Sequence, residues 1–317
     1  MKLSSILASV LVLAAASAHA SVAFLLEEPY GEFGAFNPTG HAAVYLNHVC
    51  AESPTELRMC RPGELGVVIS RYHKVDGYDW VAIPLIPYLY AVDSADEVPV
   101  TVDKAVVLSL RDTYRRNHLE NMFPDTPDDK MPSGNWTELV GSSYDRTIHG
   151  FQIDTTPEQD ERFVAEVNDK RNTSHFNLFF HNCADFSRVV LDSYFPHAIH
   201  RNFIADAGLT TPKQVARSLM KFAKKHPEAN MTAFVIPQVP GTIRRSHPVD
   251  GVAESLVKSK RYLIPLAILA PEVTGGVVAT YLVDGRVKIP KDVTIFKVGD
   301  LESMAETKPP VPGPTGE

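Results

Sequence analysis

Short apolar runs separated by polar and glycine-rich turns mark the first hundred residues, and this pattern predicts strands rather than helices. The predicted strands are His41–Leu46, Gly66–Ser70 and Trp80–Ile83. Proline follows the third run directly, which is typical of the end or the edge of a sheet strand. Residues 21–40 are punctuated by glycines and a proline, and we expect them to form a loop.

Apolar residues recur at helical spacing farther along the chain. Threonine followed by proline and, two residues later, glutamine occurs twice, at Thr156 and Thr211, and predicts a capped helix start at both places. The predicted helices are Val102–Leu119, a helix from Thr156 to about Asn168, Cys183–Tyr194, and a basic helix after Thr211 that ends near Lys225.

The two ends of the chain differ from this globular pattern. Residues 1–20 combine a lysine, an apolar run and small residues before Ser21, which is typical of a cleavable signal peptide and predicts export to the periplasm or the extracellular space. Residues 308–317 are rich in proline and glycine and are predicted to be disordered. Between them we expect a folded domain over residues 21–205 and a helical, partly apolar extension over residues 206–307.

The segment from Tyr262 to Val283 is mostly apolar, but it contains two prolines, Glu272 and a pair of glycines. Three interpretations stay open: a membrane-spanning helix, a buried strand and helix, and a helix lying on a membrane surface. The charge and the glycines argue against the first interpretation.

Composition narrows the class of protein. Apolar residues make up 44% of the chain and charged residues 22%, as in an ordinary globular protein. The formal net charge is −7 and no basic cluster stands out, which argues against a nucleic-acid partner. We find no glycine-rich phosphate loop or dinucleotide fingerprint, and expect no cofactor. A zinc site made by His41, His48, His73 and Cys183 is not expected either, because their spacing is not that of metal ligands.

The chain has three cysteines: Cys50, Cys60 and Cys183. Export permits a disulfide, and the short polar loop between the first two suits a bridge at its base, although other pairings stay open. Such a bridge leaves Cys183 as a free thiol.

Cys183 lies where an apolar run gives way to a helix. The unpaired N–H groups at a helix start favour a thiolate and can also bind an oxyanion, so Cys183 is a candidate nucleophile. A small buried cysteine is the alternative. A cysteine nucleophile also needs a base, and we select His41, because Gly40 allows close approach and the strand that follows would hold the imidazole.

The runs Gly40-His41-Ala42-Ala43-Val44-Tyr45-Leu46 and His181-Asn182-Cys183-Ala184-Asp185-Phe186 resemble the circularly permuted branch of the NlpC/P60 (papain-like) superfamily, which includes lecithin:retinol acyltransferase-like proteins. The resemblance implies an α+β fold in which the histidine strand precedes the cysteine helix. It also implies acyl transfer with Cys183 as nucleophile and His41 as base.

The same resemblance implies a third polar residue on the next strand, where Ser70, Tyr72 and His73 are the candidates. We select His73 because one imidazole can orient another. Asp185 is expected to interact with the helix dipole. His181 is an alternative base, although packing is its more natural role.

These observations predict an exported cysteine hydrolase that cleaves amide or peptide bonds, with a peptide or a peptidoglycan-type molecule of the cell envelope as substrate. A lipid acyltransferase or thioesterase that uses the same pair is the first alternative, and membrane-surface association through residues 262–283 would favour it. A non-catalytic envelope binding protein is the second.

Overall fold

The computed structural model describes residues 20–31, 39–73, 75–127, 131–132, 135–173, 176–285, 289–290 and 293–301. Most of the predicted signal peptide and all of the predicted tail lie outside the described residues.

A seven-stranded sheet forms the centre of the molecule, in the order β6-β5-β2-β1-β7-β8-β9. Neighbouring strands are antiparallel except β8 and β9, which are parallel. The strands are β1 (Ser21–Glu27), β2 (His41–Leu46), β5 (Val67–Ser70), β6 (Val81–Pro84), β7 (Ile148–Asp154), β8 (Thr232–Ile236) and β9 (Thr294–Ile295). A separate hairpin joins β3 (Val49–Ser53) to β4 (Glu56–Met59).

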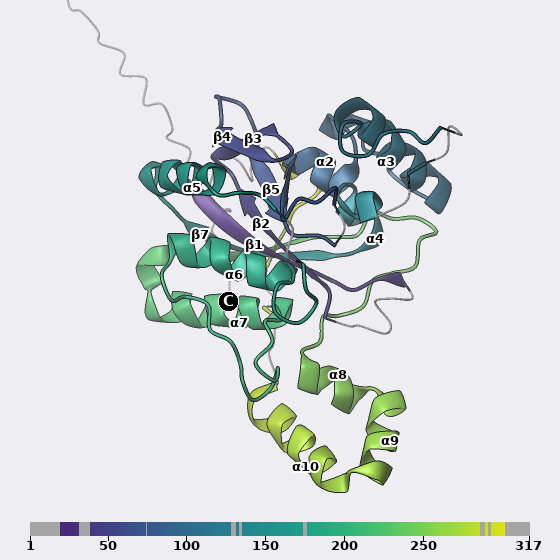
Figure 1. Cartoon of the computed structure of the whole chain (residues 1–317), viewed down its shortest axis with the longest axis vertical. Helices are drawn as coiled ribbons and strands as arrows, with labels where there is room; N and C mark the ends of the chain where they lie inside the picture. Colours follow the sequence, from purple (N-terminus) through teal and green to yellow (C-terminus); the bar gives the residue numbers. More distant parts are fainter. Residues whose placement is uncertain are drawn as a thin grey trace, which may run out of the picture.

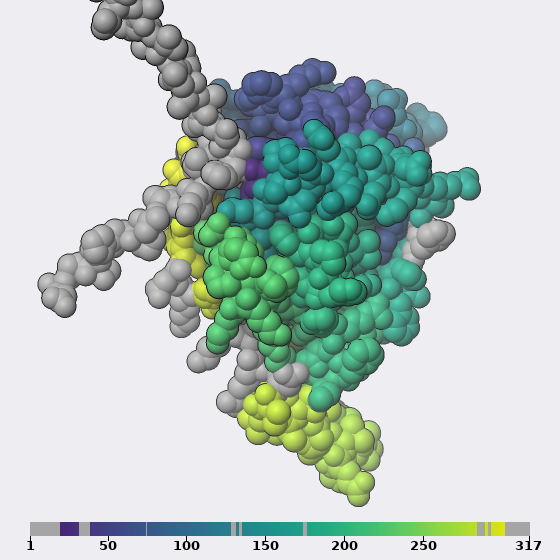
Figure 2. Space-filling view, turned by 90° about the vertical axis from the view of Figure 1, so that its left-hand side faces the viewer, coloured from purple at the N-terminus to yellow at the C-terminus, as the bar shows by residue number. Residues whose placement is uncertain are grey.

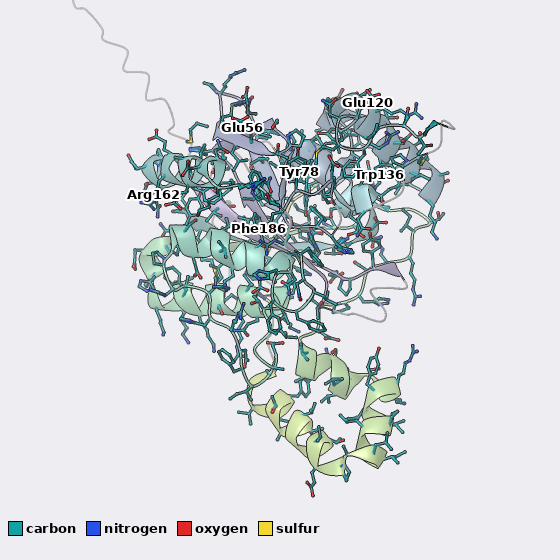
Figure 3. The ribbon with its side chains drawn as sticks, viewed as in Figure 1. Glu56, Tyr78, Glu120, Trp136, Arg162 and Phe186 are labelled. Carbon is teal, nitrogen blue, oxygen red and sulfur yellow. A yellow bond between two sulfur atoms is a disulfide. The ribbon has the colours of Figure 1, made fainter. Side chains whose placement is uncertain are left out.

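Helices cover both faces of the sheet, so the fold is α+β as predicted (Figure 1). One face packs against α5 (Pro157–Asp169), α6 (Cys183–Tyr194) and α7 (Pro212–Lys225). The other packs against α2 (Leu85–Tyr90), α3 (Lys104–His118) and α4 (Ser142–Asp145). Phe186 belongs to the first core and Trp136 to the second, on opposite sides of the sheet (Figure 3). Short 3-10 turns occupy Ala95–Glu97, Asn135–Glu138, Pro227–Ala229 and Val298–Asp300.

The locally encoded elements agree with the sequence pattern. All three predicted strands and all four predicted helices are present within a few residues. Thr156 accepts the N–H of Gln159, and Thr211 accepts that of Gln214, so both predicted caps are confirmed. These signals are reliable because a cap and its helix lie within one turn of sequence.

The prediction of a loop over residues 21–40 is wrong at its start. Ser21–Glu27 is β1, a central strand of the sheet, and all its residues are buried. A strand buried on both faces is apolar without alternation, so its sequence lacks the period of a half-buried strand.

The predicted boundary near residue 205 does not divide the structure. α7 packs in the same core as α6, while β8 pairs with β7 and β9 pairs with β8. The expected helical extension therefore supplies two strands and one helix to the main domain. The residues from 252 to 285 form α8 (Val252–Lys258), α9 (Lys260–Leu269), α10 (Pro271–Thr280) and a π-helical turn, η4 (Tyr281–Gly285). No helix in the described ranges is long and apolar enough to cross a bilayer.

Cys50 and Cys60 form a disulfide, as the loop between them predicts. The bond closes the β3–β4 hairpin at its base, where the two Cα atoms are 4.9 Å apart. A disulfide suggests an oxidising compartment outside the cytoplasm.

Replacing both Cys50 and Cys60 with alanine should lower the free energy of unfolding by about 2–3 kcal/mol, because the bond restricts a short loop of the unfolded chain. Denaturant titration measures this loss. Peptide mapping without reduction should show the two cysteines linked, both in the native sequence and in the matched Cys183→Ala variant. Finding Cys50 and Cys60 alkylated without reduction would contradict the bridge.

Candidate active site

Cys183 is the first residue of α6 and is a free, half-buried thiol. Asn182 caps this helix: its side chain accepts the N–H of Asp185 at 2.9 Å, and Asp185 in turn accepts the N–H of Asn182. This reciprocal pair fixes the start of the helix, and with it the position of the Cys183 sulfur.

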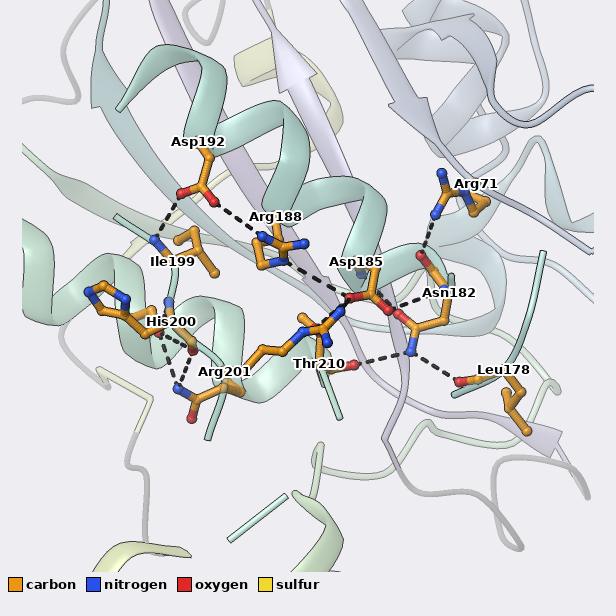
Figure 4. Close-up of polar contacts among 12 residues, drawn as sticks. Arg71, Leu178, Asn182, Asp185, Arg188, Asp192, Ile199, His200, Arg201 and Thr210 are labelled. Carbon is orange, nitrogen blue, oxygen red and sulfur yellow. Dashed lines mark hydrogen bonds and ion pairs between the residues drawn. The ribbon is translucent and has the colours of Figure 1, made fainter. Parts of the chain in front are cut away.

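Asp185 also ties a distant loop to the helix start (Figure 4). Its carboxylate accepts Arg201 at 2.8 Å and the Thr210 hydroxyl at 2.6 Å. Asn182 donates its side-chain N–H to the carbonyls of Leu178 and Thr210. Asp185 therefore sits in the first turn, as expected for a residue that interacts with the helix dipole, and it anchors the loop between α6 and α7 as well.

His41 opens β2, and its imidazole is held from two sides. Its Nε2 lies 2.9 Å from the Ser70 hydroxyl, and its ring stacks on Tyr72 with 4.8 Å between ring centroids. The single Ser70 hydroxyl hydrogen goes to the Ala42 carbonyl at 2.7 Å, so Ser70 accepts from Nε2–H. This arrangement leaves Nδ1 of His41 as the unprotonated nitrogen.

Gly40 has a φ of +72°, and a Cβ there would lie 2.1 Å from the Glu27 carbonyl. The glycine before His41 therefore permits the close approach that the sequence predicted.

Cys183 lies close to the start of β2, which His41 opens. The backbone N–H groups of Ala42 and Ala184 act to lower the pKa of the Cys183 thiol, and Ala42 is the residue directly after His41. Both groups also feel the charges of Glu27 and Arg146. By strand alternation, however, the His41 side chain starts from the face opposite α6, with Ala43 and Tyr45. Within the described residues no hydrogen bond joins the thiol to the imidazole.

Burial keeps both groups uncharged at neutral pH. It raises the pKa of the Cys183 thiol to about 11, although the N–H groups of Ala42 and Ala184 act in the opposite direction. It lowers the pKa of His41 to about 4, partly opposed by the carboxylate of Glu27. The helix start was expected to favour a thiolate, and that expectation is wrong here because removal from water outweighs the N–H groups.

Among the described residues, His73, which we selected to orient His41, makes no contact with it. Its side chain is exposed and its ring lies against Phe176, at 5.1 Å between centroids, whereas Ser70 makes the contact to His41. Ser70 is the last residue of β5, next to β2 in the sheet, and its side chain lies on the same face as that of His41. His73 lies beyond the end of the strand. His181, the alternative base, is exposed and pairs through its backbone with Asn177.

Sequence reasoning missed a buried acid beside His41. Glu27 is fully buried and is the direct cross-strand neighbour of His41. It accepts the hydroxyls of Tyr88 and, at 2.9 Å, Ser142, and it pairs with Arg146 at 3.1 Å. The first of two acids directly after the apolar run Val22–Leu26 was the available signal, because a buried acid needs partners.

The residues named for a zinc site are not brought together. In the part of the chain that the structure describes, the only group within ligating distance is Cys50, Cys60 and Glu64. Its two sulfurs are joined to each other and cannot act as thiolate ligands.

Large apolar side chains are exposed on both loops that the α6 start anchors. Leu178, Phe179 and Phe180 precede Cys183 and are each more than half exposed. Phe203 and Ile204 lie between the two residues that Asp185 holds, and are 76% and 71% exposed. These loops give the surroundings of Cys183 an apolar surface.

No protein-family model, no curated protein and no solved structure matches this chain.

Proposed function

We propose that this protein is an exported cysteine-nucleophile enzyme that cleaves an amide or peptide bond by acyl transfer. Cys183 is the nucleophile, His41 the base, and Ser70 the residue that orients His41. One observation carries the proposal: Cys183 opens a helix that packs against β2 near its start, and β2 begins with a histidine whose tautomer leaves Nδ1 free.

The reaction starts from a neutral pair, because the pKa of the thiol lies near 11 and that of the imidazole near 4. The sulfur attacks the substrate carbonyl while its proton passes to Nδ1 of His41, which gives it to the departing amine. Water then attacks the thioester with His41 again as base, releasing the acid and the thiol. The backbone N–H of Cys183 at the helix start binds the oxyanion.

The chain order supports a papain-like core in permuted order. The histidine strand precedes the cysteine helix, this helix packs on the sheet, and a polar residue of the adjacent strand contacts the histidine. We therefore propose membership of the permuted NlpC/P60 branch, with Ser70 in place of His73 as the third residue.

A lipid acyl substrate is the second candidate, and the exposed side chains of Leu178–Phe180, Phe203 and Ile204 favour it. An acyl chain would cover such a surface, whereas a polar peptide would leave it in water. Either substrate class passes through the same Cys183 thioester.

Capture of the acyl-enzyme tests the proposal. The protein is incubated with activated amides and with activated esters of short and long acyl chains, and the acylated peptide is identified by mass spectrometry. We expect a thioester on Cys183 that is absent in Cys183→Ser and strongly reduced in His41→Ala. Ser70→Ala should slow acylation about tenfold, since general-base catalysis depends on the orientation of the imidazole.

His73→Ala is the matched control, because it removes an exposed histidine from the segment after β5 and should leave acylation unchanged. Preference for long-chain esters would favour the lipid substrate. No acylation of Cys183 by any member of the panel would leave a protein that uses this fold for binding.

A further inference from the structure

Residues 252–285 form an arm that projects from the main domain (Figures 1 and 2). Its root is polar: Glu254 of α8 pairs with Lys213 of α7 at 2.5 Å, and Lys213 also donates to the Val249 carbonyl. The N–H of Ala253 donates to the Ala205 carbonyl. Beyond this root, α9 and α10 pack mainly against each other, α8 and η4. Among the described residues, the contacts of the arm with the main domain are therefore concentrated at its root.

Between Tyr262 and Tyr281 the two outer helices of the arm carry almost only apolar side chains. No residue of α9 or α10 is buried. Among their large apolar side chains, Leu269 is 83% exposed, Ile268 74%, Val273 55% and Ile264 54%. Glu272 is the only ionisable side chain between Tyr262 and Tyr281. A helix that is apolar all round normally lies in a protein core or in a membrane.

The distribution of exposed apolar side chains on the arm favours a lipid bilayer over a protein as its partner. A protein partner, including a second copy of this chain, presents one surface and would cover one face of the hairpin, leaving the other in water. A lipid bilayer surrounds what enters it, and so matches apolar side chains that are exposed along both helices.

The length and the ends of the hairpin fit one leaflet. Each of the two helices has 10 residues. This corresponds to about 15 Å, half of the roughly 30 Å apolar core of a bilayer. Tyr262 and Tyr281 lie at the open end of the hairpin, where aromatic side chains meet the headgroups, and Lys260 and Arg261 are exposed beside them. The apolar bend at Ile268, Leu269 and Ala270 lies at the other end.

We propose that this arm docks the protein on an anionic lipid bilayer by inserting the α9–α10 hairpin into one leaflet, with Lys260 and Arg261 against the headgroups. This inference does not depend on the thiol chemistry of Cys183. Glu272 opposes insertion, because its carboxylate leaves water with the bend of the hairpin.

A tryptophan at the bend reports insertion directly. Leu269→Trp is compared with Val100→Trp, a matched control at an apolar residue that is 86% exposed on the main domain. The native Trp80 and Trp136 are buried, so they give a constant background. With phosphatidylglycerol vesicles, the emission of Leu269→Trp should shift to shorter wavelength and be quenched by lipid-borne nitroxide, while Val100→Trp should not respond. No response of Leu269→Trp, or an equal response of both variants, would overturn the proposal.

Charge variants in the Leu269→Trp background test the headgroup contact. Lys260→Gln with Arg261→Gln should weaken binding to phosphatidylglycerol vesicles about 20-fold and leave binding to neutral phosphatidylcholine vesicles unchanged. Glu272→Gln should strengthen binding to both several-fold. Equal binding by all these variants would contradict the proposed orientation. A blue shift that follows protein concentration without vesicles, and that vesicles do not alter, would replace the bilayer with a second copy of the chain.

Discussion

Alkylation of Cys183 at pH 7.5 is expected to be about 100-fold slower than that of an unperturbed cysteine, and its rate should keep rising up to about pH 11. Burial raises the thiol pKa from 9.0 to about 11, and each unit reduces the reactive thiolate tenfold. Iodoacetamide kinetics followed by mass spectrometry between pH 6 and 11 measure the profile. Removing His41 should leave it unchanged, since an imidazole with a pKa near 4 is neutral throughout this range.

Val189→Cys in a Cys183→Ala background provides the matched thiol. Val189 lies on the same helix and is 53% exposed, so its cysteine should titrate near the ordinary value. A Cys183 pKa below that of this control would mean that the N–H groups of Ala42 and Ala184 outweigh burial. A pKa that rises when His41 is removed would show a preformed thiolate–imidazolium pair, contrary to the neutral pair argued above.

The sequence predicted those parts of the fold that depend on neighbouring residues. Capping at Thr156 and Thr211 and the short apolar run His41–Leu46 are local signals, and the helices and the strand form where these signals lie. β1 was missed because its burial depends on partners on both sides: β2, the next strand along the chain, and β7, more than a hundred residues later. A strand of this kind is defined by tertiary pairing rather than by its own period.

In the candidate site, too, the residues at local signals were predicted and those that depend on tertiary pairing were not. Cys183 and His41 were found because each stands at a recognisable helix or strand start. The choice between Ser70 and His73 required the end of β5 and its register with β2, which the sequence does not contain. The pairing of Glu27 with Arg146 joins β1 to the segment after α4, and no local pattern links them.

The conformation of the arm is the remaining part of the fold that the sequence did not predict. The apolar residues 262–283 were compatible with a spanning helix, a buried element or a surface helix. Pro271 begins a new helix after Ala270, so the segment folds as two short helices rather than one long one. Which side chains of this segment stay exposed depends on how the segment is placed against the main domain, and the sequence alone does not predict that placement.

Replacing Glu27 with glutamine is expected to lower the free energy of unfolding by about 3 kcal/mol, because it leaves the buried Arg146 guanidinium without its counter-charge. Burial by itself lowers the pKa of Arg146, but Glu27 reverses this and the net shift is upward. Glu56→Gln on the outer hairpin (Figure 3) is the matched control and should change stability by less than about 0.5 kcal/mol. Urea titration of both variants measures the difference.

A second variant separates the charge from the shape of this cluster. Replacing both Glu27 and Arg146 with methionine removes the two charges together and should recover part of the loss, because no unpaired ion is left in the core.

The Glu27 charge also raises the pKa of both Cys183 and His41, so in Glu27→Gln the alkylation profile of Cys183 should move to lower pH. A loss of stability without this movement would limit Glu27 to holding the fold. Movement of the profile would show that the buried ion pair tunes the reactivity of the thiol in addition to burial.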